Sequence, residues 1–194
     1  MNKAATEIKY SGVHHLALVS RDMEKTVDFY TNVLNMKYIK GFDLGGNSSG
    51  QHFFFDMGGG NLLAFFWFKG APKAAPGIAS AHGLAGESGD ITSAHGSMNH
   101  VAFHCAVDDI EAYRDTLVAK GVHCTEIVNH SDVVTEPGID RHSKTPDDKT
   151  WIRSFYFFDP DGIMLEFCCN VRAGSDYCEL PVNAEGIKAN GKSI

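Results

Sequence analysis

Three side chains in this 194-residue chain have the types and positions needed to bind a divalent metal ion together: His15, His100 and Glu166. Glu166 lies near the end of RSFYFFDPDGIMLEF (residues 153–167), where two apolar runs flank the turn sequence DPDG. This pattern predicts a β-hairpin. An ionised carboxylate in an apolar strand costs several kcal/mol of free energy unless a cation or hydrogen-bond donors meet it. Glu166 therefore needs a partner from elsewhere in the chain.

The two histidines occupy matched positions in an internal repeat. VHHLALVSRDMEKTVDFYTNVLNMKYI, from residue 13, aligns with MNHVAFHCAVDDIEAYRDTLVAKGVHCTEI, from residue 98, so that His15 matches His100 and Ala17 matches Ala102. Alternate residues of a strand share a face, so both imidazoles are expected to point into one interior. Two imidazoles and a carboxylate form a ligand set that leaves other coordination positions open. The predicted partner of Glu166 is therefore a divalent cation.

Each copy of the repeat predicts a strand followed by a helix. Asp22 and Asp109 stand where a side chain can cap the helix that follows, and Gly121 is a typical stop signal after the second helix. Apolar residues then recur at spacings of three and four, which predicts one core-facing stripe on each helix. The stripes are Met23, Val27, Tyr30 and Leu34 in the first copy, and Ile110, Tyr113 and Leu117 in the second.

The repeat continues beyond the helices. FFFDMGGGNLLAFFWF (53–68) can be laid over FYFFDPDGIMLEFCC (155–169) with Gly60 on Gly162, which makes each half strand, helix and three strands. Under this alignment Ala64 takes the place of Glu166. The prediction is one domain over 1–194, with module 1 at about 10–70, an insertion at about 70–97, module 2 at about 98–170 and a C-terminal tail at 171–194. Residues 129–150 read as a second irregular stretch.

Charge and hydropathy narrow the class of partner. The net charge is −7 and lysine and arginine form no dense cluster, which argues against nucleic acid or an anionic membrane as a partner. No apolar run reaches the roughly 18 residues that a membrane span needs, and the N-terminal MNKAATEIKY lacks the apolar stretch of a signal peptide. We expect a cytoplasmic protein with a small-molecule substrate.

GVHHLALVSRDMEKTVDFYTNVLNM, NHVAFHCAVDD and FYFFDPDGIMLEF resemble the vicinal oxygen chelate superfamily of glyoxalases, bleomycin-resistance proteins and extradiol dioxygenases, over residues 10–170. The resemblance implies an α+β fold in which paired βαβββ modules form a U-shaped, metal-holding barrel. Its ligand positions match His15, His100 and Glu166. FYFFDPDGIMLE is also similar to the signature of extradiol dioxygenases, with Tyr156 in the place of the tyrosine that contacts the substrate hydroxyl group.

The chain departs from that superfamily at two places. Glyoxalase I and methylmalonyl-CoA epimerase carry a fourth ligand, Glu or Gln, in the first module, where this chain has Ala64. The dioxygenases carry a histidine shortly before the tyrosine, whereas the nearest upstream histidine here is His142, farther away in the second irregular stretch. His104, two residues after His100 on the same predicted strand face, is a candidate for substrate contact.

The leading interpretation is an extradiol-type ring-cleaving dioxygenase for a catechol-like substrate. Fe(II) is the favoured metal, with Mn, Zn or Ni as alternatives, and Tyr156, His142 and His104 are the candidate catalytic residues. The alternatives are a lyase or isomerase of the glyoxalase or epimerase type and, behind it, a ligand-binding resistance protein of the bleomycin type. A homodimer is the candidate assembly. The residues leave the identity of the substrate and of the metal open.

Overall fold

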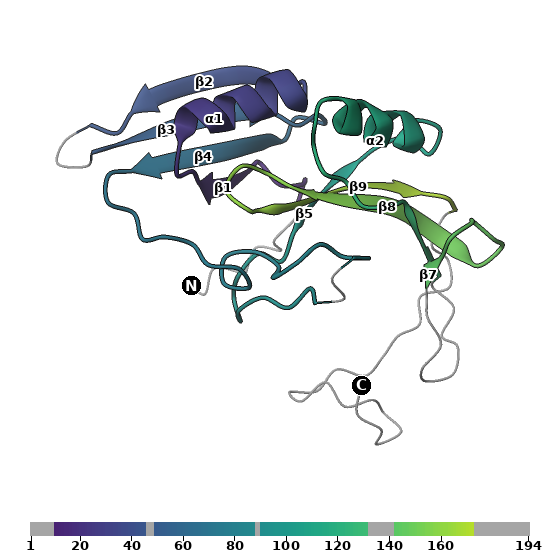
Figure 1. Cartoon of the computed structure of the whole chain (residues 1–194). Coiled ribbons are helices and arrows are strands. Elements are labelled where there is room, and N and C mark those ends of the chain that lie inside the picture. The colour runs from purple at the N-terminus through teal and green to yellow at the C-terminus, as the bar shows by residue number, and fades with distance from the viewer. Residues whose placement is uncertain (1–9, 46–48, 88–89, 132–141, 173–194) are drawn as a thin grey trace, which may run out of the picture. The chain divides into compact units, whose positions relative to one another are not determined.

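The computed structural model describes residues 10–45, 49–87, 90–131 and 142–172, which fall into two compact units (Figure 1). The first unit contains the described residues up to His82, together with Thr92–Asn99 and Phe158–Ile163. The second unit contains Gly83–Ile91, His100–Phe157 and the residues from Met164 onward. Each unit has its own sheet and its own helix.

The first unit is a four-stranded sheet with one helical segment beside it. Its elements are β1 (His15–Val19), α1 (Met23–Asp28), the π-helical turn η1 (Phe29–Val33), β2 (Lys37–Asp43), β3 (Gly50–Asp56) and β4 (Leu62–Phe68). The strand order is β1-β4-β3-β2, with β1 parallel to β4 and the other neighbours antiparallel. This is the predicted βαβββ arrangement.

Helix α1 begins where the sequence predicts and ends early. The Asp22 carboxylate accepts a hydrogen bond from the backbone N–H of Lys25 at 3.3 Å, as the capping prediction requires. The helix was expected to run on to Leu34 but becomes a π-helical turn after Asp28. Within that segment the Thr31 hydroxyl donates to the carbonyl oxygen of Val27 at 2.6 Å. The Leu34 N–H bonds to the Phe29 carbonyl, five residues earlier, at 2.9 Å, which is the hydrogen-bond spacing of a π-helix.

The core of the first unit lies between α1–η1 and one face of the sheet. Tyr30, which is fully buried, packs its ring 4.8 Å from the ring of Phe65 and 5.7 Å from that of Phe55. The Tyr30 hydroxyl donates to the Asp159 carboxylate at 3.1 Å. Asp159 opens the turn 159–163 between two strands of the second unit, yet the turn itself belongs to the first unit.

The second unit repeats the pattern with one additional strand. Its elements are β5 (Val101–His104), α2 (Ile110–Ala119), β6 (Val128–Ser131), β7 (His142–Ser143), β8 (Thr150–Phe158) and β9 (Met164–Asn170), in the order β5-β9-β8-β6-β7. Strands β8 and β9 form the predicted hairpin. The prediction that 129–150 is irregular was wrong at both ends, because β6 and β7 pair with each other there. Residues 132–141 lie outside the described part of the chain.

The prediction that Asp109 caps helix α2 was wrong. Asp109 makes no side-chain capping hydrogen bond, because its backbone is already helical, with φ −101° and ψ −13°, instead of extended as a capping residue requires. The helix ends as predicted, with Gly121 at φ +83°. Ile110 and Leu117 are buried, while Tyr113 is 40% exposed and rests its ring edge against Phe167.

Strand register confirms the internal alignment residue by residue. In the first unit β1 pairs with β4 so that Ala17 lies opposite Ala64. In the second unit β5 pairs with β9 so that Ala102 lies opposite Glu166. The two parallel pairs therefore have equivalent registers, and Ala64 occupies the position that Glu166 occupies in the other unit.

The predictions for the insertion, the C-terminal tail and the overall barrel are tested only in part by the described residues. The described residues of the insertion, 70–87 and 90–97, contain turns but no helix or strand. Residues 173–194 of the predicted tail lie outside the described part, and the U-shaped barrel and single domain stay predictions because they concern how the units meet. No helix among the described residues is long and apolar enough to cross a membrane.

Candidate metal site

The parallel pairing of β5 with β9 brings two of the predicted ligands together. His100, immediately before β5, places its Nε2 atom 3.0 Å from Oε2 of Glu166. The Glu166 side chain is 5% exposed and the His100 side chain 36% exposed. A buried carboxylate therefore lies behind an imidazole that solvent can reach.

Hydrogen bonds keep the Glu166 carboxylate ionised. Burial raises its pKa, but hydrogen bonds from His100, Ser154 and Tyr156 lower it further than burial raises it, so the net pKa is below its usual value. The protein thus supplies three donors to the buried glutamate that the sequence left without a partner. The negative charge is present at neutral pH, as a metal ligand requires.

Tyr156 lies on the neighbouring strand β8 and contacts both predicted ligands of this unit. Its ring meets the His100 ring edge-on, with centroids 6.0 Å apart. Its hydroxyl oxygen accepts a hydrogen bond from Ser154 Oγ at 3.2 Å. Burial, followed by the charge of Glu166, raises the Tyr156 pKa well above its usual value. The phenol is therefore protonated at neutral pH and acts as a hydrogen-bond donor to Glu166.

The network extends to two residues that the sequence analysis did not single out. His130, on β6, has its Nε2 atom 2.9 Å from Ser154 Oγ, and Ser154 is fully buried. The ring of His142, on β7, meets the His130 ring edge-on at 4.8 Å. Burial, and then the neighbouring His142, lower the pKa of His130. His142 thus lies beside the network and is joined to it through His130.

Of these two residues, sequence alternation could have identified only Ser154. Ser154 is two residues before Tyr156 and so shares its face of the strand, which the pattern could have indicated. His130 could not have been found this way. Its place depends on the register of β6 against β8, where His130 pairs with Ile152, and a long intervening segment hides that register in the sequence.

His104 lies at the end of β5, opposite Cys168 of β9. It is exposed, and by alternation it shares the face that carries Ala102 and Glu166. Burial, and then the charge of Glu166, raise the pKa of the Cys168 thiol to about 12, so this cysteine is neutral. The structure therefore places His104 two register positions away from the pair that contains the predicted ligand Glu166, on the same face.

His15 begins β1 of the first unit and is exposed. Its Nδ1 atom lies 2.8 Å from Nδ1 of His14, and its ring lies 5.9 Å from the ring of Phe54. Because His15 and the His100–Glu166 pair belong to different units, its role as the third ligand stays a prediction. Within either unit, the described residues contain no group of three or more His, Cys, Asp or Glu side chains placed to hold a metal ion.

The donor atoms of the second unit fit a divalent ion. An ion with bonds of about 2.1 Å to nitrogen and oxygen holds two ligands at right angles about 3.0 Å apart. The observed separation of His100 Nε2 and Glu166 Oε2 is 3.0 Å. Imidazole together with carboxylate is also a donor set typical of Fe, Mn and Zn sites. These two side chains could hold such an ion once the Nε2 proton of His100, which now bonds to Glu166, is displaced.

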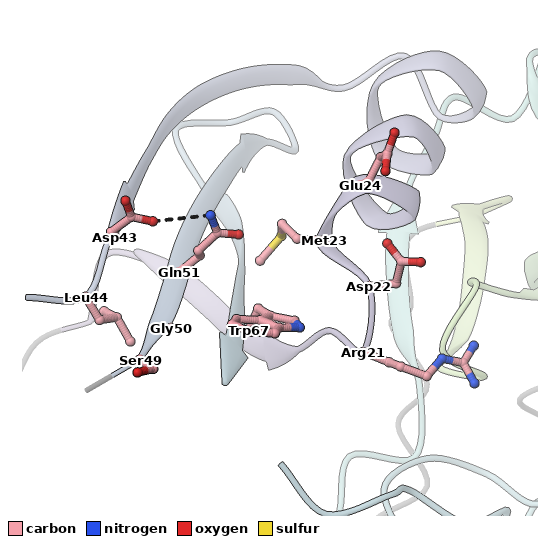
Figure 2. Close-up of a pocket in the computed structure, with 10 residues that line it drawn as sticks. All are labelled: Arg21, Asp22, Met23, Glu24, Asp43, Leu44, Ser49, Gly50, Gln51 and Trp67. Carbon is pink, nitrogen blue, oxygen red and sulfur yellow. Dashed lines mark hydrogen bonds between the residues drawn. The ribbon is translucent and has the colours of Figure 1, made fainter. Parts of the chain in front are cut away.

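A separate cleft of about 630 Å³ opens on the first unit (Figure 2). Its wall includes Trp67 and Gln51, and Gln51 donates to the Asp43 carboxylate at 3.2 Å. Trp67 and Gln51 pair with each other and point to the face of the sheet that carries α1. His15 lies on the opposite face, so this cleft is not the metal site.

Comparison with known proteins places the chain in a family. The family model described as the Glyoxalase/Bleomycin resistance protein/Dioxygenase superfamily matches residues 12–167. The chain belongs to this superfamily, as the resemblance of its motifs predicted. No curated protein matches the chain significantly in sequence.

Solved structures share the fold. The crystal structure of SMU.1112c is 27% identical, with a TM-score of 0.52 over 82% of this chain and 99% of that one. A glyoxalase family protein from Enterococcus faecalis is 20% identical, with a TM-score of 0.55 over 82% and 98%. A fosfomycin resistance protein, FosX, from Listeria monocytogenes, complexed with Mn(II) and sulfate, is 18% identical, with a TM-score of 0.50 over 84% and 95%. The latter two similarities establish the fold alone.

Proposed function

We propose that this chain is a metal-dependent enzyme that binds one divalent ion through His15, His100 and Glu166 and cleaves the ring of a catechol-like substrate with dioxygen. The equivalent registers of the two units carry this proposal. They support His15 and His100 as a related pair, and they put Ala64, which cannot bind a metal, at the counterpart of Glu166.

The absence of a ligand at position 64 favours oxygen chemistry over the four-ligand glyoxalase type. A facial set of two histidines and one carboxylate leaves three positions of a six-coordinate ion for two substrate oxygens and dioxygen. A glutamate at position 64 would take one of these positions. The alanine found there keeps the set at three protein ligands.

The residues of the second unit have distinct roles in this proposal. Glu166 is ionised, so it can bind a cation without first losing a proton. Tyr156 keeps its proton, so it cannot serve as a base at neutral pH, and it can donate to an ionised substrate oxygen only by giving up its hydrogen bond to Glu166. Proton removal falls to a histidine, for which His104 and His142 are the candidates.

A second candidate is a reaction without oxygen, of the glyoxalase, epimerase or fosfomycin-resistance type. It is motivated by the fold neighbours, one of which is named a glyoxalase family protein and another of which holds Mn(II). Capture of a ligand without catalysis is the third candidate. The ionised Glu166 beside His100 argues against it, because simple capture needs no such pair.

The deciding experiment separates oxygen consumption from metal binding. The protein is purified anaerobically, loaded with Fe(II) or Mn(II), and offered a panel of catechols in an oxygen electrode with parallel absorbance scans. We expect oxygen uptake that requires the metal and yields a ring-cleaved, conjugated product. Turnover of a hemithioacetal or an epoxide without oxygen, and no uptake with any catechol, would establish the second candidate instead.

A cytoplasmic location and a homodimeric assembly are further parts of the proposal. The homodimer can be checked by light scattering at working concentrations, where the expected mass is twice that of the 21.1 kDa chain.

The expected partner is a small molecule. A metal-loaded protein that binds no catechol, measured by charge-transfer absorption, would contradict this part.

A further inference from the structure

His130 and Ser154 connect the β6–β7 edge of the second unit to the proposed ligand Glu166. Four contacts form the chain: His142 against His130, His130 to Ser154, Ser154 to Tyr156, and Tyr156 to Glu166. Ser154, Tyr156 and Glu166 are all buried, so solvent does not compete for these hydrogen bonds. The role inferred for this chain rests on the proposed metal site.

The hydrogen bonds in this chain have one direction. Ser154 has one hydroxyl proton, and the acceptors within its reach are the oxygen of Tyr156 and the carboxylate of Glu166. Its bond with His130 at 2.9 Å therefore needs the proton on the histidine Nε2 atom. Burial, and then His142, lower the pKa of His130, which makes it a neutral ring with a single N–H. Tyr156 in turn directs its proton to Glu166, so every donor points toward the carboxylate.

We propose that His130 is a positioning residue of the metal site: through Ser154 it fixes the Tyr156 hydroxyl as a donor to Glu166 and so holds the carboxylate beside His100. Without the Nε2 proton of His130, Ser154 can rotate and donate elsewhere. The oxygen of Tyr156 then loses its donor, and the phenol is free to turn away from Glu166. The carboxylate would keep its burial but lose part of its orientation.

Metal affinity is the first readout, with Mn(II) as the probe in wild type, His130→Leu and Ser154→Ala. Groups that orient a ligand typically affect metal affinity about 10- to 100-fold, and we expect both variants to fall in that range. His130→Gln keeps a side-chain N–H of similar reach and should recover most of the affinity. The matched control is His123→Leu, which removes an exposed histidine of the same unit that pairs with Glu87 at 3.0 Å.

The second readout needs no metal. Long-range proton–nitrogen NMR of the metal-free protein should show the His130 ring protonated on Nε2, and Ser154→Ala should shift the His130 signals while circular dichroism stays unchanged. Protonation on Nδ1, or Mn(II) affinities of His130→Leu and Ser154→Ala equal to wild type, would overturn the positioning role. Failure of the wild type to bind Mn(II) would instead overturn the proposed site, and this role with it.

Discussion

The two units have the same strand register but use it for different chemistry. In the sequence alignment that matches Ala64 with Glu166, Phe54 matches Tyr156 and His52 matches Ser154. In the second unit these positions form a chain of hydrogen bonds around an ionised carboxylate. In the first unit they form an aromatic cluster, in which the His52 ring stacks 3.6 Å from Phe66 and lies 4.2 Å from Phe54.

This difference shows that side chains at matched register positions make one unit apolar and the other polar. In the first unit the predicted ligand is His15, whose ring lies 5.9 Å from the ring of Phe54. The second offers His100 and Glu166 with the donors that support them. Two units with the same register have thus diverged, one toward contacts between aromatic rings and the other toward an ionised carboxylate with its hydrogen-bond donors.

The largest expected effect comes from making the second unit resemble the first. Glu166→Ala removes the ionised carboxylate, so metal binding should fall by more than the roughly 10- to 100-fold that an outer group costs. Isothermal titration with Mn(II) measures this loss. Glu111→Ala, which removes an exposed carboxylate of the same unit paired with Arg153, is the control and should bind as wild type. Equal Mn(II) affinities in wild type, Glu166→Ala and Glu111→Ala would show that Glu166 is not a metal ligand.

The reverse change gives the first unit the carboxylate that it lacks. Ala64 is fully buried beside aromatic residues, so Ala64→Glu should destabilise the metal-free protein by several kcal/mol. Metal should restore the stability if the new carboxylate reaches the ion, and oxygen uptake should be suppressed because a substrate position is filled. Melting curves with and without Mn(II) test this. A variant that Mn(II) stabilises no more than it stabilises wild type would show that position 64 is remote from the site.

The two units also differ in the turn that joins their last two strands, β3 to β4 in the first unit and β8 to β9 in the second. Met57 N–H bonds to the Asn61 carbonyl in one turn, and Asp159 N–H bonds to the Ile163 carbonyl in the other. Asp159 is buried, and burial raises its pKa to about 6 despite donors from the backbone and from Tyr30. The folded state therefore keeps a proton that the unfolded state releases, and stability falls as the pH rises from about 4 to about 6.

Replacing this carboxylate should remove that pH dependence. A pKa raised by about two units corresponds to about 2–3 kcal/mol of unfolding free energy, so Asp159→Asn should gain that much relative to wild type between pH 4 and pH 7. Urea unfolding across this range measures the difference. Asp161→Asn, at a residue two positions along the same turn that pairs with Arg21, serves as the comparison. A constant difference between Asp159→Asn and wild type would mean that Asp159 titrates normally.

The smallest expected effect concerns His52. Its Nε2 atom is buried and, among the described residues, has no hydrogen-bond partner. Burial, and then His15, lower the pKa of His52, so the ring is neutral. His52→Phe should remove the cost of that unsatisfied atom and raise the unfolding free energy by about 1 kcal/mol. A decrease in stability, measured by urea unfolding, would mean that the nitrogen is satisfied in solution.

Much of the fold could be predicted because local and repeated signals agree. The alignment of 53–68 with 155–169 predicted the equivalence of Ala64 and Glu166, and Asp22 predicted the start of α1, since a cap depends only on nearby backbone. The π-helical turn was not predictable, because apolar spacings of three and four do not distinguish a regular helix from the local turn that Leu34 closes on Phe29. Asp109 failed as a cap because the turn before α2 is already helical.

The site was predictable only in part, for a different reason. His100 directly precedes β5 and Glu166 lies on β9, the neighbouring parallel strand, and the repeat fixes the register of this strand pair. His130 reaches Ser154 only through the register of β6 with β8, which depends on the path of a long connection. Whether His15 joins the pair depends on how the two units meet, which neither alternation nor spacing determines.

A comparison of metal binding by variants of two adjacent histidines tests the proposed site most directly. His14 and His15 are neighbours, both exposed, with Nδ1 atoms 2.8 Å apart, yet only His15 is predicted to bind the ion. Mn(II) titration followed by electron paramagnetic resonance should find one ion per chain in wild type and in His14→Ala, and a strong loss of binding in His15→Ala. Binding by His15→Ala with wild-type affinity and stoichiometry would contradict the three-ligand site.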